Sequence, residues 1–172
     1  MNFSFDSDPR MISFKRKIGY DEAIMNEKRD GLIAIDFLKL EAPSFATQWP
    51  DENGWMVNKR EYSLFRWRTK ATHAALGIVA VVHENYEDAQ EWFLFKAHSS
   101  NMEELPWIAC SKKIGTVCAQ ATGKRMVFFA YKNVMIEVVL MSREPGHEDF
   151  ALVLAEWLFD ALKAAPLKPM PR

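Results

Sequence analysis

Residues 126–141 read MVFFAYKNVMIEVVLM, which is two apolar runs separated by Lys132-Asn133. Aromatic and β-branched residues dominate both runs, as is typical of buried strands. A two-residue loop is the commonest connection in a β-hairpin, and Asn tolerates the positive φ that such a loop requires. The segment therefore predicts an antiparallel hairpin with strands at 126–131 and 134–141, and we expect this hairpin to carry the core.

Four segments before the hairpin also have the composition of strands. Residues 62–69 alternate in polarity, and residues 76–83 form a β-branched run. Residues 32–38 and 114–122 are predicted as further strands, and residues 102–111 as a connection.

Two amphipathic helices are expected. The first begins after an N-cap at Asn85, with Asp88 three residues on, and extends to His98. The second runs from His147 to Ala164 and carries a helical apolar stripe formed by Phe150, Val153, Leu154, Trp157, Leu158, Ala161 and Leu162.

This order of elements predicts an α+β fold. Strands joined by short turns pair antiparallel, so we expect a two-layer sandwich in which a mainly antiparallel sheet carries both helices on one face. Residues 1–164 are expected to form a single globular domain, in which the place of residues 1–30 is left open and could be peripheral. Within them, the charged stretch from Lys15 to Asp30 could be a short helix or the first arm of a hairpin. Residues 165–172 hold three prolines and are expected to form a flexible tail.

Composition limits the classes of function. The chain has 172 residues, 49% of them hydrophobic, and a net charge of −1, so it has no global field that would attract nucleic acid or an anionic membrane. No apolar run reaches the roughly 20 residues that span a bilayer, and the first residues do not resemble a signal peptide. A soluble protein is expected, with nucleic acid not expected as a partner and the compartment left open.

Cys110 and Cys118 are the only cysteines. Their spacing fits neither a redox pair nor a zinc knuckle. A disulfide holds two Cα atoms about 4.4–6.8 Å apart, so the chain would have to reverse near Lys112-Lys113, where neither Gly nor Pro stands. Two free thiols are therefore predicted, whereas a bridge would indicate an oxidising compartment.

No motif in the sequence requires a metal, a cofactor or a nucleophile. The histidines, His73, His83, His98 and His147, have no helical pair spacing, and G-x-S-x-G is absent. The glycines are scattered, so no phosphate-binding loop is predicted. We expect no metal site and no cofactor.

Two surface features are candidate binding sites. Residues 59–70 hold five cations against one carboxylate, and on a strand one face would carry Arg60, Tyr62, Arg66, Arg68 and Lys70. That stripe could bind an anionic ligand or an acidic protein, or it could be a solvated face. On the last helix, Leu152 and Phe159 share one side and would form a protein interface if exposed, or core if covered.

Residues 77–162 resemble small exported bacterial proteins and lipoproteins of the PsbP-like α/β/α group. The shared features are Tyr86-Glu87-Asp88-Ala89 at a helix start, Ile114-Gly115, a hairpin with Asn133 at its turn, and a terminal helix at 150–162. The usual Gly before the turn Asn is Lys132 here, and the usual Asp after the central Gly is Thr116. The resemblance implies an exported, non-enzymatic accessory module of unstated ligand.

Three functional hypotheses remain open. The first is a binding or accessory module that uses the outer sheet face or a groove between sheet and helices. The second is a hydrolase or transferase whose site is assembled in space, which a deep pocket lined by titratable groups would favour. The third is an interaction or immunity-type protein that docks through the last helix. The sequence favours the first, with a protein or an anionic ligand as the partner.

Overall fold

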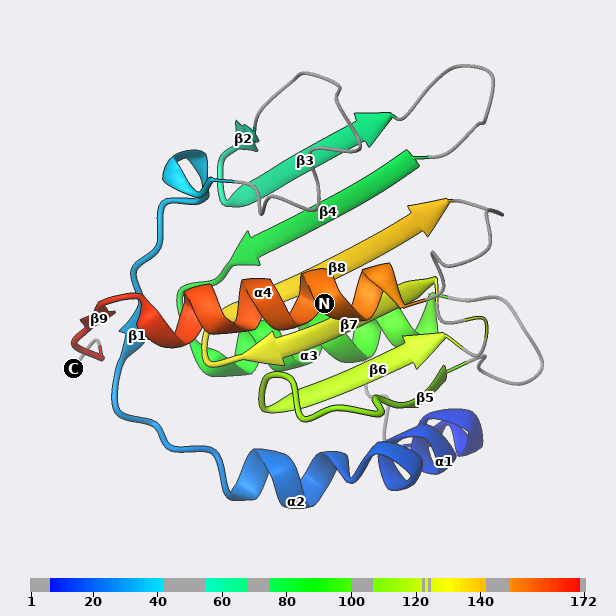
Figure 1. Cartoon of the computed structure of the whole chain (residues 1–172). Helices are drawn as coiled ribbons and strands as arrows, with labels where there is room; N and C mark the ends of the chain where they lie inside the picture. The colour runs from blue at the N-terminus through cyan, green and yellow to red at the C-terminus, as the bar shows by residue number, and fades with distance from the viewer. Residues whose placement is uncertain are drawn as a thin grey trace.

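The computed structural model describes residues 7–41, 55–67, 75–99, 107–121, 123, 125–141 and 149–170. Its centre is a seven-stranded sheet in the order β2-β3-β4-β8-β7-β6-β5, in which every neighbouring pair is antiparallel (Figure 1). The α+β class with a mainly antiparallel sheet is confirmed. In chain order the strands are β2 (Met56–Asn58), β3 (Glu61–Trp67), β4 (Ala75–Val82), β5 (Trp107–Ala109), β6 (Val117–Ala121), β7 (Met126–Tyr131) and β8 (Val134–Met141).

The two long helices, α3 (Tyr86–His98) and α4 (Phe150–Ala164), lie on opposite faces of the sheet (Figure 1). On β7, Phe129 packs in the same core cluster as Leu158 of α4, whereas Phe128 packs with Phe93 of α3. The expectation that both helices cover one face is therefore wrong. Successive strand residues point to opposite faces, and because β7 is apolar at every position, both faces need a helix.

The predicted hairpin is confirmed, with β7 and β8 joined by Lys132-Asn133. The residue with positive φ is Lys132, at 53°, and not the Asn that tolerates this conformation best. Helix α3 also begins as predicted, because the Asn85 side chain accepts a hydrogen bond from the Asp88 N–H at 2.7 Å.

Helix α4 differs from its prediction in start and orientation. It begins at Phe150, and Val153 is 37% exposed, although it was placed in the buried stripe. Leu152, which was predicted as part of an interface, is instead 4% exposed and belongs to the core between α4 and the sheet. The apolar residues of this helix cover more than one stripe, so the sequence alone did not fix which side faces the sheet.

Residues 9–18 and 20–25 are helical, so over these residues the charged stretch that begins at Lys15 forms helix and not a hairpin arm. Helix α1 (Pro9–Ile18) begins at Asp8, whose side chain accepts from the Arg10 N–H at 2.9 Å. Gly19, at φ 66°, ends α1 and leads into α2 (Tyr20–Met25). Both helices pack on the α3 side of the sheet, where Phe14 and Tyr20 lie against Phe93.

Two short strands, one after α2 and one after α4, pair with each other. Only Leu32–Ile33 of the predicted strand at 32–38 forms a strand (β1), and a 3-10 helix (η2, Phe37–Lys39) follows it. Strand β1 pairs antiparallel with β9 (Leu167–Lys168), and the Ala34 N–H donates to the Pro166 carbonyl at 2.9 Å. Residues 166–168 of the predicted tail are therefore paired with the chain around β1, because a proline that cannot donate a hydrogen bond can still accept one.

Cys110 and Cys118 form a disulfide, so the prediction of two free thiols is wrong. Strand β5 lies inside the segment that was expected to be a connection, and its register pairs Ala109 with Ala119. The next residues along the two strands are the two cysteines, whose Cα atoms are 5.7 Å apart. The reversal between the strands includes Gly115, at φ 66°, rather than a turn at Lys112-Lys113 alone.

Candidate functional site

The predicted basic stripe is only partly within the described residues. Arg60 lies at the turn before β3 and forms an ion pair with Glu84. Tyr62 is half-buried, with its ring centroid 5.2 Å from that of Phe37. Arg66 lies on β3 opposite Leu76, while Arg68 and Lys70 fall outside the described residues. Tyr62 thus packs against Phe37. Anion binding by this strand stays a prediction.

Phe159, the other residue of the predicted interface, is half-buried at the edge of the α4 core. Its ring meets those of Phe129 and Tyr131 edge-on, with centroids 6.2 Å and 5.1 Å away. The Lys163 ammonium lies 4.7 Å from the centre of the same ring. With Leu152 buried, these two residues do not form the exposed apolar patch that a docking surface would need.

A polar pocket lies instead between α2 and the end of the sheet that carries the β7–β8 turn. Its volume is about 450 Å³. It is lined from four parts of the chain, by Gly19, Glu22, Ala23 and Asn26 of α2 and its ends, by Glu27, Lys28 and Asp30, by Lys113, Gly115 and Thr116, and by Tyr131 and Lys132. We call residues 26–33, which run from the end of α2 through β1, the arm.

The loop that forms one side of the pocket is fixed in place by its glycine. A Cβ on Gly115 would lie 2.6 Å from the Ala130 carbonyl oxygen and 2.8 Å from the Phe129 ring. The close approach allows the next residue, Thr116, to donate its N–H to the same Ala130 oxygen at 2.8 Å. Gly at this position therefore allows the loop to pack directly against β7.

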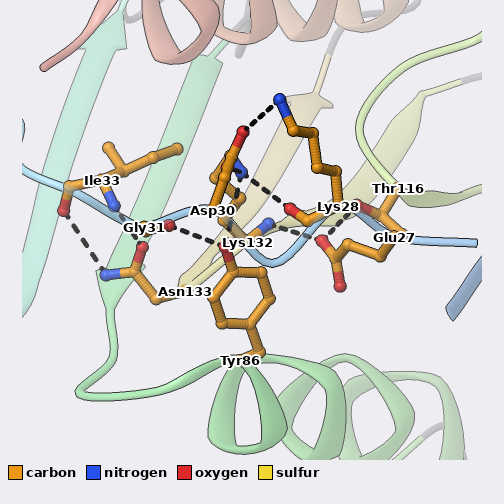
Figure 2. Close-up of polar contacts among 9 residues, drawn as sticks. All are labelled: Glu27, Lys28, Asp30, Gly31, Ile33, Tyr86, Thr116, Lys132 and Asn133. Carbon is orange, nitrogen blue, oxygen red and sulfur yellow. Dashed lines mark hydrogen bonds and ion pairs between the residues drawn. The ribbon is translucent and has the colours of Figure 1, made fainter. Parts of the chain in front are cut away.

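Lys132 forms the inner wall of the pocket, and its side chain is only 6% exposed. Its ammonium donates to the Asp30 carboxylate, to the Lys28 carbonyl at 3.0 Å and to the Tyr86 hydroxyl at 3.3 Å (Figure 2). Burial alone would lower the pKa of Lys132, but the hydrogen bonds to Asp30 and Tyr86 raise it overall. The ammonium is therefore a permanent charge that holds the arm.

Glu27 joins the arm to three other segments. Its carboxylate accepts hydrogen bonds from the Thr116 hydroxyl, from the Lys132 backbone N–H at 2.9 Å and from the Gln90 amide at 2.9 Å (Figure 2 shows the first two). All three donors are neutral, because the Lys132 ammonium binds Asp30 instead. Among the residues that the structure describes, the negative charge of Glu27 is thus hydrogen-bonded but not paired with a cation.

Asn133 and Tyr86 hold the far end of the arm. The Asn133 side-chain oxygen accepts the Ile33 N–H at 2.6 Å, and its amide donates to the His83 carbonyl at 3.0 Å. The Tyr86 hydroxyl donates to the Gly31 carbonyl at 2.7 Å. The arm is therefore bound to the hairpin turn and to α3 along its length, and this gives the pocket a fixed wall.

The rim of the pocket carries charges of both signs. Glu22 and Lys113 are exposed, and within the described residues neither has an ion-pair partner. Lys28 pairs with Asp30 at 3.1 Å. The pocket therefore offers an available carboxylate on α2 and an available ammonium on the loop before β6.

The sequence did not predict any pocket residue as functional, but departures from the resembling pattern occur at two residues that line the pocket. Lys132 and Thr116 are the two positions at which residues 77–162 depart from the pattern that they resemble. The Thr116 side chain donates to Glu27, and the Lys132 side chain donates to Asp30. Both departures therefore contact the arm, which the sequence could not show because the arm lies outside the resembling segment.

Comparisons with protein-family models, curated proteins and solved structures give no match for this chain. In the part of the chain that the structure describes, no three potential metal ligands lie together. None of the described helices is long and apolar enough to cross a membrane.

Acid should weaken the attachment of the arm through Asp30. Hydrogen bonds from Lys132 and Lys28 lower the pKa of Asp30 to about 2. A carboxylate with a depressed pKa in the folded state adds stability above its unfolded pKa of about 3.9, and this stability is lost as the pH falls towards the folded value. Urea unfolding between pH 5 and pH 2 should therefore show a shallower loss of stability for Asp30→Asn than for wild type.

The matched control for that experiment is Asp160→Asn, which removes a carboxylate whose side chain is 71% exposed. Its unfolding free energy should follow the wild-type pH dependence. If Asp30→Asn also runs parallel to wild type, the Asp30–Lys132 contact does not contribute to stability.

Proposed function

We propose that this chain is a non-enzymatic binding module that takes a small polar ligand in the pocket between α2 and the hairpin turn. The observation that carries the proposal is the wall made by Glu27 and Lys132, whose side chains are fixed by hydrogen bonds to other parts of the protein. A wall that is already ordered loses little entropy when a ligand binds. The volume of about 450 Å³ also lies within the usual range for small-molecule sites.

We further propose that the module is an exported accessory protein. The resemblance to exported PsbP-like domains implies this compartment, and the Cys110–Cys118 bridge supports it because disulfides persist in oxidising compartments. Helices on both faces of the sheet are also compatible with that resemblance. Alkylation of the protein from its native cells without reductant should add no group, and two groups should be added after reduction. Two groups added without reductant would contradict export.

A second candidate function, a hydrolase or transferase, rests on the hydrogen bond from the Thr116 hydroxyl to Glu27. A hydroxyl beside a carboxylate can act as a nucleophile with its base. Binding is favoured over catalysis because the same Glu27 oxygen also accepts the Lys132 N–H, and Gln90 occupies the other oxygen. Hydrolysis of p-nitrophenyl acetate that is lost in Thr116→Val would instead favour the enzyme.

The binding proposal can be tested by NMR with a set of small polar fragments that are neutral, cationic, anionic or zwitterionic. We expect the fragments that bind to shift the backbone amide signals of Gly115 and Thr116. Asn26→Trp should abolish these shifts, because Asn26 is exposed on the pocket rim and an indole there would fill the space. Asn58→Trp, at the exposed edge strand β2, is the control and should bind as wild type does. Shifts that persist in Asn26→Trp would overturn the proposal.

A further inference from the structure

We infer that the ligand of this pocket is a small zwitterion that carries an ammonium and a carboxylate, as a free amino acid or a short peptide does. The inference rests on the proposed binding function and adds the chemical class of the ligand. It follows from which charges of the pocket are neutralised within the protein and which are not.

Two of the pocket's cations, Lys28 and Lys132, already form ion pairs within the protein. The Lys132 ammonium is buried on Asp30, the Lys28 carbonyl and Tyr86, and Lys28 pairs with the same Asp30. Asp30 therefore lies between two ammonium groups, as Figure 2 shows. These three residues carry a net charge of +1, because two ammonium groups share one carboxylate, and their contacts with one another hold the arm.

The carboxylates on the α2 side are not neutralised in the same way. Among the described residues, Glu27, which lines the pocket, accepts only from neutral donors, and Glu22, which is exposed on α2, has no ion-pair partner. A half-buried carboxylate without a bonded cation is an attractive position for a ligand ammonium, because contacts between charged groups strengthen as water is excluded. Glu22 and Glu27 would thus receive the positive end of the ligand.

The loop before β6 supplies the opposite charge. Lys113 is exposed at the pocket and, within the described residues, has no carboxylate partner, whereas its neighbour Lys112 pairs with Glu156 of α4. Lys113 is therefore free to receive the carboxylate of a ligand. A dianion would place a second negative charge against Glu22 and Glu27, and a dication would repel Lys113, so a ligand with one charge of each sign fits best.

The test compares alanyl-alanine with its N-acetyl and its C-terminal amide derivatives, each titrated into the wild-type chain while the Thr116 amide is followed by NMR. We expect alanyl-alanine to bind and each blocked derivative to bind roughly tenfold more weakly, because each lacks one charge-assisted contact. Free alanine, titrated in parallel, distinguishes an amino acid from a peptide as the source of the zwitterion. Higher salt should weaken binding at this open site.

Two charge variants assign the ends of the ligand. Glu22→Gln should weaken alanyl-alanine and its amide but leave the N-acetyl form unchanged. Lys113→Gln should weaken alanyl-alanine and its N-acetyl form but leave the amide unchanged. Lys17→Gln, an exposed cation on α1 outside the pocket, is the control and should change none of the three affinities.

The outcomes separate this inference from the proposed function. If neutral fragments or both blocked derivatives bind in the pocket as tightly as alanyl-alanine, the inference that the ligand is a zwitterion is wrong, and the pocket remains a binding site. The same inference is also overturned if neither alanyl-alanine nor free alanine binds at millimolar concentration while other fragments bind in the pocket. If no fragment shifts Gly115 or Thr116, the proposed function itself fails.

Discussion

Phe128→Ala should lower the free energy of unfolding by about 3–5 kcal/mol, the range for deletion of a fully buried aromatic side chain. Phe128 is 0% exposed and lies at the centre of the core on the α3 face. Its ring is 4.8 Å from that of Phe93 and 4.6 Å, edge-on, from that of Trp107. The change therefore leaves a cavity between β7, α3 and the edge strand β5. These elements are separate in the chain, and all three contribute to the contacts of this ring.

Two further variants make the Phe128 experiment specific. Ile136→Ala, on the α4 face of β8, should cost about 2–5 kcal/mol. Phe95→Ala removes a phenylalanine that is 37% exposed, and we expect it to cost under about 1 kcal/mol. Chemical denaturation that gives under 1 kcal/mol for both Phe128→Ala and Ile136→Ala would contradict the placement of the hairpin at the centre of the fold.

The hairpin and helix α3 could be predicted because their signals are local. Lys132-Asn133 lies directly between two apolar runs, and Asn85 caps a helix through Asp88 three residues later. The positive φ at Lys132 was missed because it depends on distant partners. Its ammonium is held by Asp30 and Tyr86, 102 and 46 residues away in sequence, and these contacts hold the side chain in place at a turn position where Gly would be usual.

The layer arrangement could have been inferred from one feature of β7. A strand with one solvated face alternates between apolar and polar residues, whereas every residue from Met126 to Tyr131 is apolar or aromatic. Such a strand is buried on both sides, which requires helices on both faces of the sheet. Helices α1 and α2 add to the cover of the α3 face, and the sequence pattern of residues 1–30 does not show this.

The disulfide and the pocket could not be predicted from the sequence, for different reasons. Strand β5 is three residues long and follows Pro106, so it has too little pattern to be recognised, and without its register the cysteines have no reason to meet. The pocket is assembled from segments far apart in the chain. Glu27 contacts Thr116 and Lys132 across 89 and 105 residues. No local pattern reports contacts of that range.

Asn133→Ala should lower the free energy of unfolding by about 3 kcal/mol, because it leaves buried backbone groups without partners. Asn133 is 2% exposed, and its side chain satisfies the Ile33 N–H at 2.6 Å and the His83 carbonyl at 3.0 Å. Alanine can replace neither contact, and an unsatisfied buried group costs about 1–3 kcal/mol. The turn itself should persist, since the His83 N–H donates to the backbone carbonyl of residue 133, which the substitution retains.

The structural change caused by Asn133→Ala should be confined to the arm and β9. The amides of Leu154 and Leu158 in α4, which exchange by global unfolding, should lose protection only by the fall in global stability, whereas the Ile33 amide should also exchange faster through local opening of the arm. Asn58→Ala, at the exposed end of β2, serves as the matched control and should change stability by under about 0.5 kcal/mol. A loss under 1 kcal/mol, with unchanged exchange at Ile33, would mean that the arm is held without Asn133. The fixed wall on which ligand binding is proposed would then depend on Lys132 and Glu27 alone.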